Sequence, residues 1–172
     1  MVLIKKKESW KRFSIKASLM LCVMAAGLIY FNARFQIGFD FQEISSIPGQ
    51  RLYVIDKWDQ ELIKGKRYAY WSKGLEPIFD DGSIMVKILV AEPGDKVEVD
   101  DNYQVLIDDK PTRYYGLAQA ERVGYEPEEF VGSASLAEDE FWFMGTHELS
   151  FDSRYYGAIS STQVIGRAYP IL

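Results

Sequence analysis

The 172-residue chain has one cysteine and one histidine. With Cys22 alone, no disulfide can form within the chain, so any domain must rely on its hydrophobic core. Cysteine and histidine are the usual ligands of zinc and related metals, and one of each supplies too few for such a site. The glycines are scattered at turns and form no phosphate-binding loop. We therefore expect no metal and no cofactor.

Basic residues are scarce beyond the first 16 positions. Those positions carry six basic residues and one acidic residue, whereas the remaining residues carry 14 basic and 24 acidic ones. An acidic main body argues against nucleic acid as the partner. The length suffices for one domain with a real core, and no internal repeat or low-complexity tract divides the chain.

One segment is free of charge: residues 17–31 read ASLMLCVMAAGLIYF, and only Lys16 interrupts the run from position 13. About 20 apolar residues span a bilayer, and flanking positive charge favours the cytoplasmic side. We predict a cytoplasmic basic tail at 1–12, a transmembrane signal anchor at 13–31 and an exported domain at 32–172. A cleaved secretory signal and a buried helix of a soluble protein are the alternatives.

The pattern after the anchor predicts β structure. Runs of β-branched and aromatic residues alternate with turns that contain Gly or Pro, and 15% of the chain is aromatic, which favours strands. We expect a mainly β, antiparallel domain. Residues 112–139 are interpreted as an insertion with a short helix at 117–123. The predicted strands are 51–58, 67–71, 83–91, 96–100, 103–111, 140–145 and 163–172.

Lys87 interrupts the apolar strand IMVKILVA at 84–91. Burying an unpaired ammonium group is unfavourable, so two interpretations compete. Lys87 is either a charge that blocks unwanted pairing at a sheet edge or a general base whose pKa is lowered by burial. A general base requires a nucleophile elsewhere in the chain.

Two further polar stretches supply candidates. SSIPG at 45–49 offers Ser45 and Ser46, although serine, proline and glycine also form simple turns. SFDSRYYG at 150–157 contains an Asp and an Arg that would form an ion pair within a polar loop. Each stretch alone fits the structural interpretation, and only their combination with Lys87 favours catalysis.

In order, the apolar anchor, SSIPG, MVKILVAEPGDKVEV and SFDSRYYG resemble the type I signal peptidases, which are membrane-anchored serine–lysine proteases. The resemblance covers most of residues 10–170, with 112–139 as the exception. It implies a signal-peptidase-like β domain in which Ser46 is the nucleophile and Lys87 the general base. It also implies supporting roles for three residues of the last stretch: Ser150 orients the Lys87 ammonium group, and Asp152 and Arg154 form an ion pair.

The chain departs from the common leader peptidases in several places. Their serine precedes Met-x-Pro, whereas Pro48 follows Ser46 at the second position and Ser45 at the third, so Ser45 stays open as the nucleophile. Ile88 replaces their usual arginine, and their Gly-Asp-Asn-Arg element is absent. SIPG followed by LY, together with FDSRYYG, is closer to the TraF-type conjugative transfer signal peptidases, which process pilin subunits.

This resemblance implies a location and a partner. We expect a single-pass protein of the bacterial inner membrane with its N-terminus cytoplasmic and its catalytic domain periplasmic. Its substrate would be a membrane-tethered, pilin-like precursor, and the lipid bilayer would be a second partner. The Ser46 backbone N–H is the expected oxyanion donor, with Ser45 as a second donor because Ile44 stands where many relatives have a serine.

Three alternatives remain at this point. The chain could be a non-catalytic, membrane-anchored assembly factor for a conjugative pilus on the same fold. It could be a soluble serine–lysine autoprotease of the repressor type, although the apolar anchor weighs against that. A conventional triad with His147 is the third, but it would leave Lys87 unexplained.

Overall fold

The computed structural model describes residues 9–171. Residues 1–8, most of the predicted basic tail at 1–12, lie outside the described residues. The chain divides into two compact units, one that ends at Phe35 and one that begins at Gln36.

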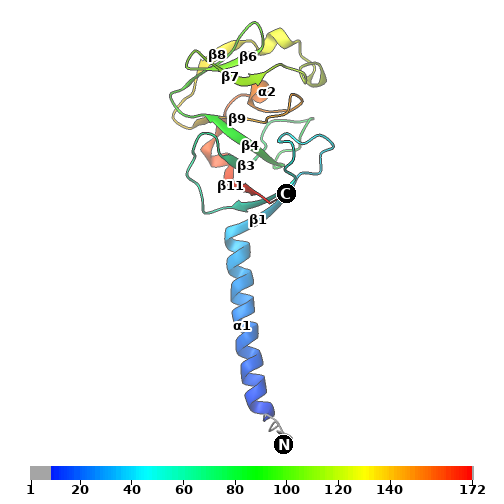
Figure 1. Cartoon of the computed structure of the whole chain (residues 1–172), viewed down its shortest axis with the longest axis vertical. Helices are drawn as coiled ribbons and strands as arrows, with labels where there is room; N and C mark the ends of the chain where they lie inside the picture. Colours follow the sequence, from blue (N-terminus) through cyan, green and yellow to red (C-terminus); the bar gives the residue numbers. More distant parts are fainter. Residues whose placement is uncertain (1–8, 172) are drawn as a thin grey trace, which may run out of the picture. The chain divides into compact units, whose positions relative to one another are not determined.

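The first unit is built on one helix, α1 (Trp10–Arg34), drawn in blue in Figure 1. Its 25 residues rise about 37 Å, which exceeds the ~30 Å hydrocarbon core of a bilayer. Within residues 9–171 it is the one helix long and apolar enough to cross a membrane. None of its residues is buried, Cys22 included, which does not fit a helix packed in a soluble core. The helix extends past the predicted 13–31 at both ends.

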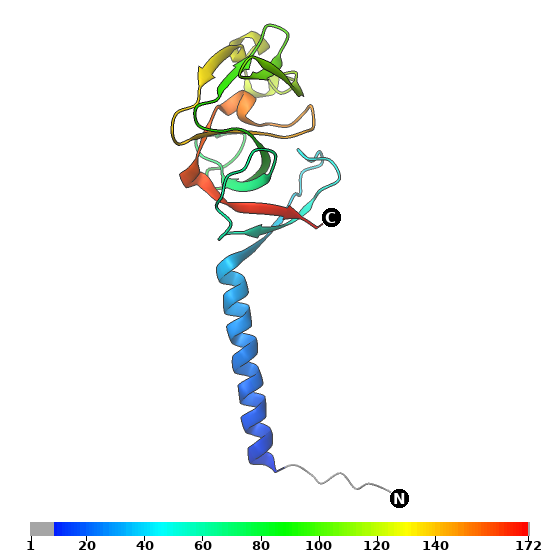
Figure 2. The same cartoon turned by 60° about the vertical axis from the view of Figure 1, so that its left-hand side comes forward.

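The second unit contains two antiparallel sheets. The larger has the strand order β1-β2-β11-β3-β4-β9-β10. In Figures 1 and 2, β4 and β9 lie between β11 and the smaller sheet, so these two strands connect the halves of the domain. The strands of the larger sheet are β1 (Phe35–Phe39), β2 (Leu52–Asp56), β3 (Arg67–Trp71), β4 (Ile84–Ala91), β9 (Glu140–Met144), β10 (Ile159–Ser160) and β11 (Val164–Pro170).

The smaller sheet has the order β7-β6-β5-β8. Its strands are β5 (Lys96–Val99), β6 (Gln104–Ile107), β7 (Lys110–Tyr115) and β8 (Gly132–Ser135). The strand predicted at 103–111 is in fact a hairpin, because Asp108 and Asp109 both have positive φ angles, 49° and 61°. Two successive positive φ values are typical of the tight turns that join antiparallel strands.

Residues 112–139, interpreted from the sequence as an insertion, supply most of β7 and all of β8. The helix expected at 117–123 is wrong: only Glu121–Val123 form a 3-10 turn, η1, which Gly124 ends with a φ of 82°. A second 3-10 turn, η2 (Pro127–Phe130), follows. This segment therefore carries part of the sheet and two short turns.

Lys87 lies in the middle of β4, whose neighbours are β3 and β9. Strand residues two apart share a face, so Lys87 lies on the same face as Met85 and Leu89, which belong to a buried core cluster. It faces Tyr68 across the β3–β4 ladder. Because β4 is a central strand, the interpretation of Lys87 as a charge that protects a sheet edge is wrong.

Candidate active site

Ser46 lies in the loop between β1 and β2, where its backbone is held firmly. Its carbonyl oxygen accepts hydrogen bonds from the N–H groups of Thr146 (2.8 Å) and His147 (3.1 Å). The neighbouring Ile47 is buried, and Gly49 takes a left-handed conformation with φ 77° that completes the turn after Pro48. The loop therefore presents the Ser46 side chain from a fixed position.

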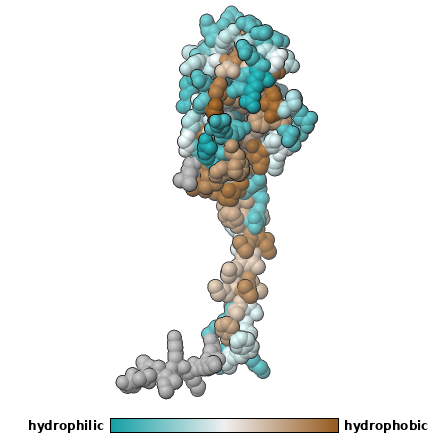
Figure 3. Space-filling view, turned by 90° about the vertical axis from the view of Figure 1, so that its right-hand side faces the viewer, coloured by the Kyte–Doolittle hydropathy of each residue, from teal (hydrophilic) through white to brown (hydrophobic). Residues whose placement is uncertain are grey.

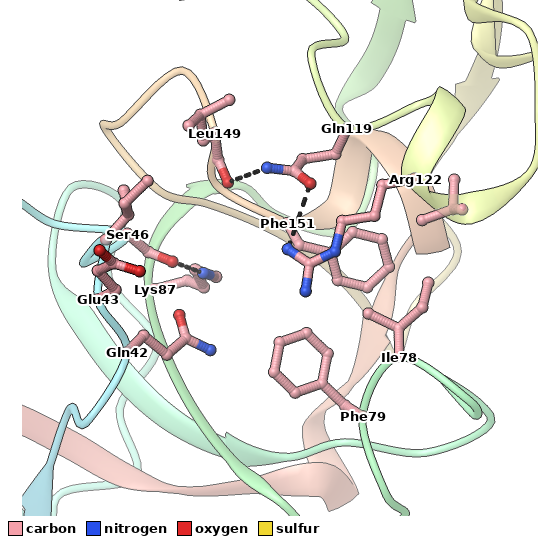
Figure 4. Close-up of a pocket in the computed structure, with 12 residues that line it drawn as sticks. Gln42, Glu43, Ser46, Ile78, Phe79, Lys87, Gln119, Arg122, Leu149 and Phe151 are labelled. Carbon is pink, nitrogen blue, oxygen red and sulfur yellow. Dashed lines mark hydrogen bonds between the residues drawn. The ribbon is translucent and has the colours of Figure 1, made fainter.

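The Nζ of Lys87 donates a hydrogen bond to the Oγ of Ser46. Figure 4 shows the two side chains pointing toward each other at one side of a pocket. The pair joins a loop residue and a central-strand residue that are 41 positions apart in the sequence. A hydroxyl and an amine in direct contact are the two groups that a serine–lysine hydrolase requires.

Burial alters the chemistry of Lys87. The side chain is 4% exposed, and desolvation lowers its pKa from 10.5 to about 8, although the nearby Asp152 carboxylate opposes this shift. A lysine with such a pKa is partly neutral near physiological pH and has a free lone pair. It can therefore accept a proton from a neighbouring hydroxyl.

Ser45 makes different contacts. Its hydroxyl group donates to the carbonyl oxygen of Ile47 (3.1 Å) and accepts from the N–H of the same residue (3.3 Å). It is buried in the loop, so its hydrogen bonds stabilise the turn that carries Ser46. The Ser46 N–H, by contrast, makes no hydrogen bond within residues 9–171 and is free to serve as a donor.

Asp152 and Arg154 form a buried ion pair. The guanidinium group donates to both carboxylate oxygens, Nε to Oδ1 and Nη2 to Oδ2, each at 2.9 Å. Burial alone would lower the pKa of Arg154, but the Asp152 carboxylate holds it above its ordinary value. Arg154 also donates to the carbonyl oxygens of Tyr115 and Gly116. The pair thus joins its loop to the end of β7.

Asp152 has a second task in the same loop. Its Oδ2 accepts a hydrogen bond from the backbone N–H of Gly145 (3.0 Å). Its Oδ1 caps the short helix α2 (Ser153–Tyr156) by accepting a hydrogen bond from the backbone N–H of Arg154. Gly145 directly precedes the two N–H groups that hold the Ser46 carbonyl oxygen. The carboxylate therefore fixes the segment against which the Ser46 loop rests.

Ser150 is 1% exposed, and its hydroxyl makes no hydrogen bond within the described part of the chain. A Cβ atom on Gly145 would collide with the Ser150 hydroxyl and lie 2.7 Å from the Ser46 carbonyl oxygen. Ser150 therefore packs closely behind the Ser46 loop. The structure contains no hydrogen bond from its hydroxyl to Lys87.

His147 approaches Ser46 through its backbone only. Its Nδ1 accepts from the N–H of Leu149 (3.0 Å), and the residue lines a small cavity that neither Ser46 nor Lys87 lines. The imidazole is thus used in a local turn. This arrangement gives no support to a conventional triad.

Two cavities meet at Ser46 and Lys87, which line both. One, of about 450 Å³, is largely apolar and has Ile37, Phe39 and Met85 in its wall. The other, of about 360 Å³, has a mixed wall. Its polar side chains are those of Gln42, Glu43, Gln119 and Arg122, and its apolar ones include Ile78, Phe79 and Phe151. Figure 3 shows apolar residues gathered on one region of the domain's visible face and polar residues on another.

Sequence reasoning missed Gln119 and Arg122 because they belong to 112–139, which was interpreted as an insertion. No periodicity or motif in that segment marks them. They reach the cavity because the chain returns from β7 toward the loop at Leu149, where Gln119 donates a hydrogen bond.

A hydroxyl–lysine pair in a mainly β domain that follows one apolar helix is the arrangement of the membrane-anchored serine–lysine hydrolases. Comparison with known families is consistent with this class. Residues 39–172 match the family described as signal peptidase, peptidase S26. The chain belongs to this family.

The chain was also compared with solved structures and with curated proteins. A crystal structure of a signal peptidase I from Enterococcus faecalis V583 is similar with a TM-score of 0.41 and 21% sequence identity, covering 63% of this chain and 97% of that one. No curated protein sequence matches the chain.

Proposed function

We propose that this protein is a membrane-anchored serine endopeptidase that removes signal or leader segments from exported precursors. The observation that carries the proposal is the hydrogen bond between Lys87 and Ser46 in a member of the signal peptidase family. The lowered pKa of Lys87 and the two cavities that meet at the pair support it further.

In the proposed mechanism, the Oγ of Ser46 attacks the scissile carbonyl carbon while its proton passes to the neutral Nζ of Lys87. The Ser46 N–H donates to the developing oxyanion. The tetrahedral intermediate expels the amine, which takes the proton from Lys87, and an acyl ester on Ser46 remains. Water, deprotonated by Lys87, then hydrolyses the ester.

The residues around Ser46 and Lys87 would have supporting roles. Asp152 and Arg154 would act as positioning residues, because their ion pair and the Gly145 contact hold the segment behind Ser46. Ser150, whose buried hydroxyl has no hydrogen-bond partner within residues 9–171, would orient the Lys87 ammonium group. Ser45 would stabilise the loop and would not provide the second oxyanion donor, since its hydroxyl is bonded to Ile47.

The substrate that we propose is a membrane-tethered precursor, specifically the pilin of a conjugative transfer system. The sequence similarity of SIPG and FDSRYYG to the TraF-type enzymes supports this choice. Helix α1 and the signal peptidase family fit a membrane-anchored protein. We further propose the bacterial inner membrane as the location, with the N-terminus cytoplasmic and the catalytic domain periplasmic and in contact with lipid.

Coexpression with a candidate pilin precursor tests the activity. Ser46→Ala should abolish the size shift of the precursor. Ser45→Ala should only weaken it, because the loop loses the hydrogen bonds of the Ser45 hydroxyl with Ile47 and Gln50 but keeps its nucleophile. An inactive Ser45→Ala with an active Ser46→Ala would move the nucleophile by one residue. Wild-type processing by Ser46→Ala would contradict the mechanism and favour a non-catalytic assembly factor.

A further inference from the structure

The smaller of the two cavities beside Ser46 contains a cation that has no role in the proposed mechanism. Arg122, on η1, lines the same cavity as Ser46 and Lys87. Figure 4 shows its guanidinium group turned into this space, across the cavity from the two catalytic candidates. An arginine in this position can contact a peptide bound at Ser46.

A hydrogen bond with Gln119 positions the Arg122 side chain. Gln119 is 7% exposed, and its Nε2 donates to the carbonyl oxygen of Leu149 (3.0 Å). Its Oε1 is thereby directed toward Arg122 and accepts a long hydrogen bond of 3.5 Å from Nη1. This contact leaves most of the five N–H donors of the guanidinium group unused.

The charges in the cavity do not cancel that of Arg122. No carboxylate of residues 9–171 forms an ion pair with Arg122. The acidic residue in the cavity wall is Glu43, which lies beside Ser46 and away from the guanidinium group. Lys87 is buried and bonded to Ser46. The exposed guanidinium therefore offers a planar, two-pronged site of the kind that binds carboxylates.

The two cavities indicate which part of a substrate reaches Arg122. The apolar cavity, with Ile37, Phe39 and Met85 in its wall, suits the end of an apolar signal segment. The cavity of mixed polarity that contains Arg122 is then left for the residues that follow the scissile bond. A cavity of this volume is on the order of 10 Å across, which an extended chain covers in about three residues.

We propose that Arg122 selects precursors with an aspartate or glutamate among the first three residues after the scissile bond. This proposal rests on the proposed function, since it names the substrate class for the same site. The carboxylate of the substrate would pair with the guanidinium group, while Gln119 keeps that group inside the cavity.

Peptide binding to the full-length Ser46→Ala protein in detergent micelles tests this without requiring cleavage. The probes are fluorescent peptides of one leader–mature junction with Asp or Asn at each of three positions on either side of the scissile bond. We expect Asp to bind about tenfold more tightly than Asn at one of the three following positions, and no such gain at the preceding ones.

Substitutions then assign the effect to Arg122. Arg122→Gln in the same background should reduce the preference for Asp over Asn below about twofold, and Arg122→Glu should make the Asn peptide bind more tightly than the Asp peptide. Arg113→Gln is the matched control: Arg113 is exposed on β7, does not line this cavity, and should retain the preference.

Equal binding of the Asp and Asn peptides, a preference that survives Arg122→Gln, or no binding of any peptide would overturn the proposal. Cleavage of the neutral peptide by the protein with Ser46 intact is measured separately. If the neutral peptide is not cleaved, that result counts against the proposed function. The role of Arg122 is decided separately by the binding measurements.

Discussion

At the scale of single residues, Lys87 combines a stability cost with a chemical benefit. It lies on the same face of β4 as Met85 and Leu89, and that burial lowers its pKa to about 8. At pH 7 about a tenth of such a lysine is neutral, against under about 0.1% of a lysine with an unperturbed pKa. The same desolvation that supplies the neutral amine also destabilises the protonated form.

The first prediction concerns the pH dependence of processing. Activity should rise with pH through an apparent pKa near 8, because only neutral Lys87 accepts the Ser46 proton. Lys87→Arg should be inactive at every pH tested, since the guanidinium stays protonated. The measurement is kcat/KM from pH 6 to 10. An active Lys87→Arg protein would contradict the role of Lys87 as a base.

The second prediction concerns stability. The pKa of Lys87 is lower in the folded than in the unfolded state, so below about pH 8 both states hold the proton and the cost of burial is fully present. Between about pH 8 and 10.5 the unfolded state binds the proton more tightly, so the stability of the wild type rises with pH.

Lys87→Met removes that dependence. At pH 7 the variant should be more stable than the wild type by up to about 3 kcal/mol, and the difference should shrink as the pH rises from 8 to 10. Thermal unfolding of both full-length proteins in detergent, followed by near-ultraviolet circular dichroism, measures it. A variant less stable than the wild type at pH 7 would show that the charge itself stabilises the fold.

At the scale of elements, the segment after β9 supports the nucleophile loop. Gly145 donates its N–H to Asp152, and the next two residues hold the Ser46 carbonyl oxygen. The space at Gly145 admits no side chain, because a Cβ would lie 2.7 Å from that oxygen. The position of Ser46 therefore depends on a glycine 99 residues further along the chain.

The third prediction follows from this contact. Gly145→Ala should shift the Ser46 loop, lower kcat by about 100-fold and reduce the free energy of unfolding by about 1–3 kcal/mol. Gly27→Ala serves as the control, because a Cβ there meets no atom within 4 Å. Full activity in Gly145→Ala would mean that the loop adjusts without cost.

Local pattern predicted the strands better than it predicted the site. The strand at 67–71 has the observed bounds, and those at 84–91 and 140–144 differ from the prediction by one residue at one end. Three strands are absent from the prediction: β1, β8 and β10. β8, whose sequence is GSAS, lacks the β-branched and aromatic residues that mark strands. β10 has only two residues, and β1 (FQIGF) directly follows the apolar helix, so neither stands out as a separate run.

The sequence motifs identified the candidate site residues, but the contacts between those residues could be seen only in the folded structure. Lys87 was singled out by its apolar neighbours, and its contact with Ser46 depends on the position of the loop at 45–50 beside β4. The distinction between Ser45 and Ser46 came from hydrogen bonds that no sequence pattern encodes. Arg122 reaches the cavity because the chain after β7 returns to the loop at Leu149, and no pattern in the sequence indicates that contact.

At the scale of the whole molecule, charge and hydropathy are divided along the chain. The first 16 residues, which include the first turns of α1, carry six basic residues, whereas the remainder of the chain is acidic overall. The domain also keeps several apolar side chains exposed, which include Phe39, Phe41 and Ile44. Exposed apolar side chains are available for contact with an apolar partner, as the membrane-tethered substrate proposed above requires.

The last prediction is the topology. Positively charged flanks stay on the cytoplasmic side of a single helix, so the C-terminus should lie across the membrane from residues 1–12. A reporter enzyme that needs disulfides to fold, fused after Leu172, should be active, because disulfides form outside the cytoplasm. A cytoplasm-dependent reporter at the same site should be inactive. The reverse pattern would place the Ser46–Lys87 pair in the cytoplasm, where no leader segment emerges after export, and would contradict the proposed function together with the topology.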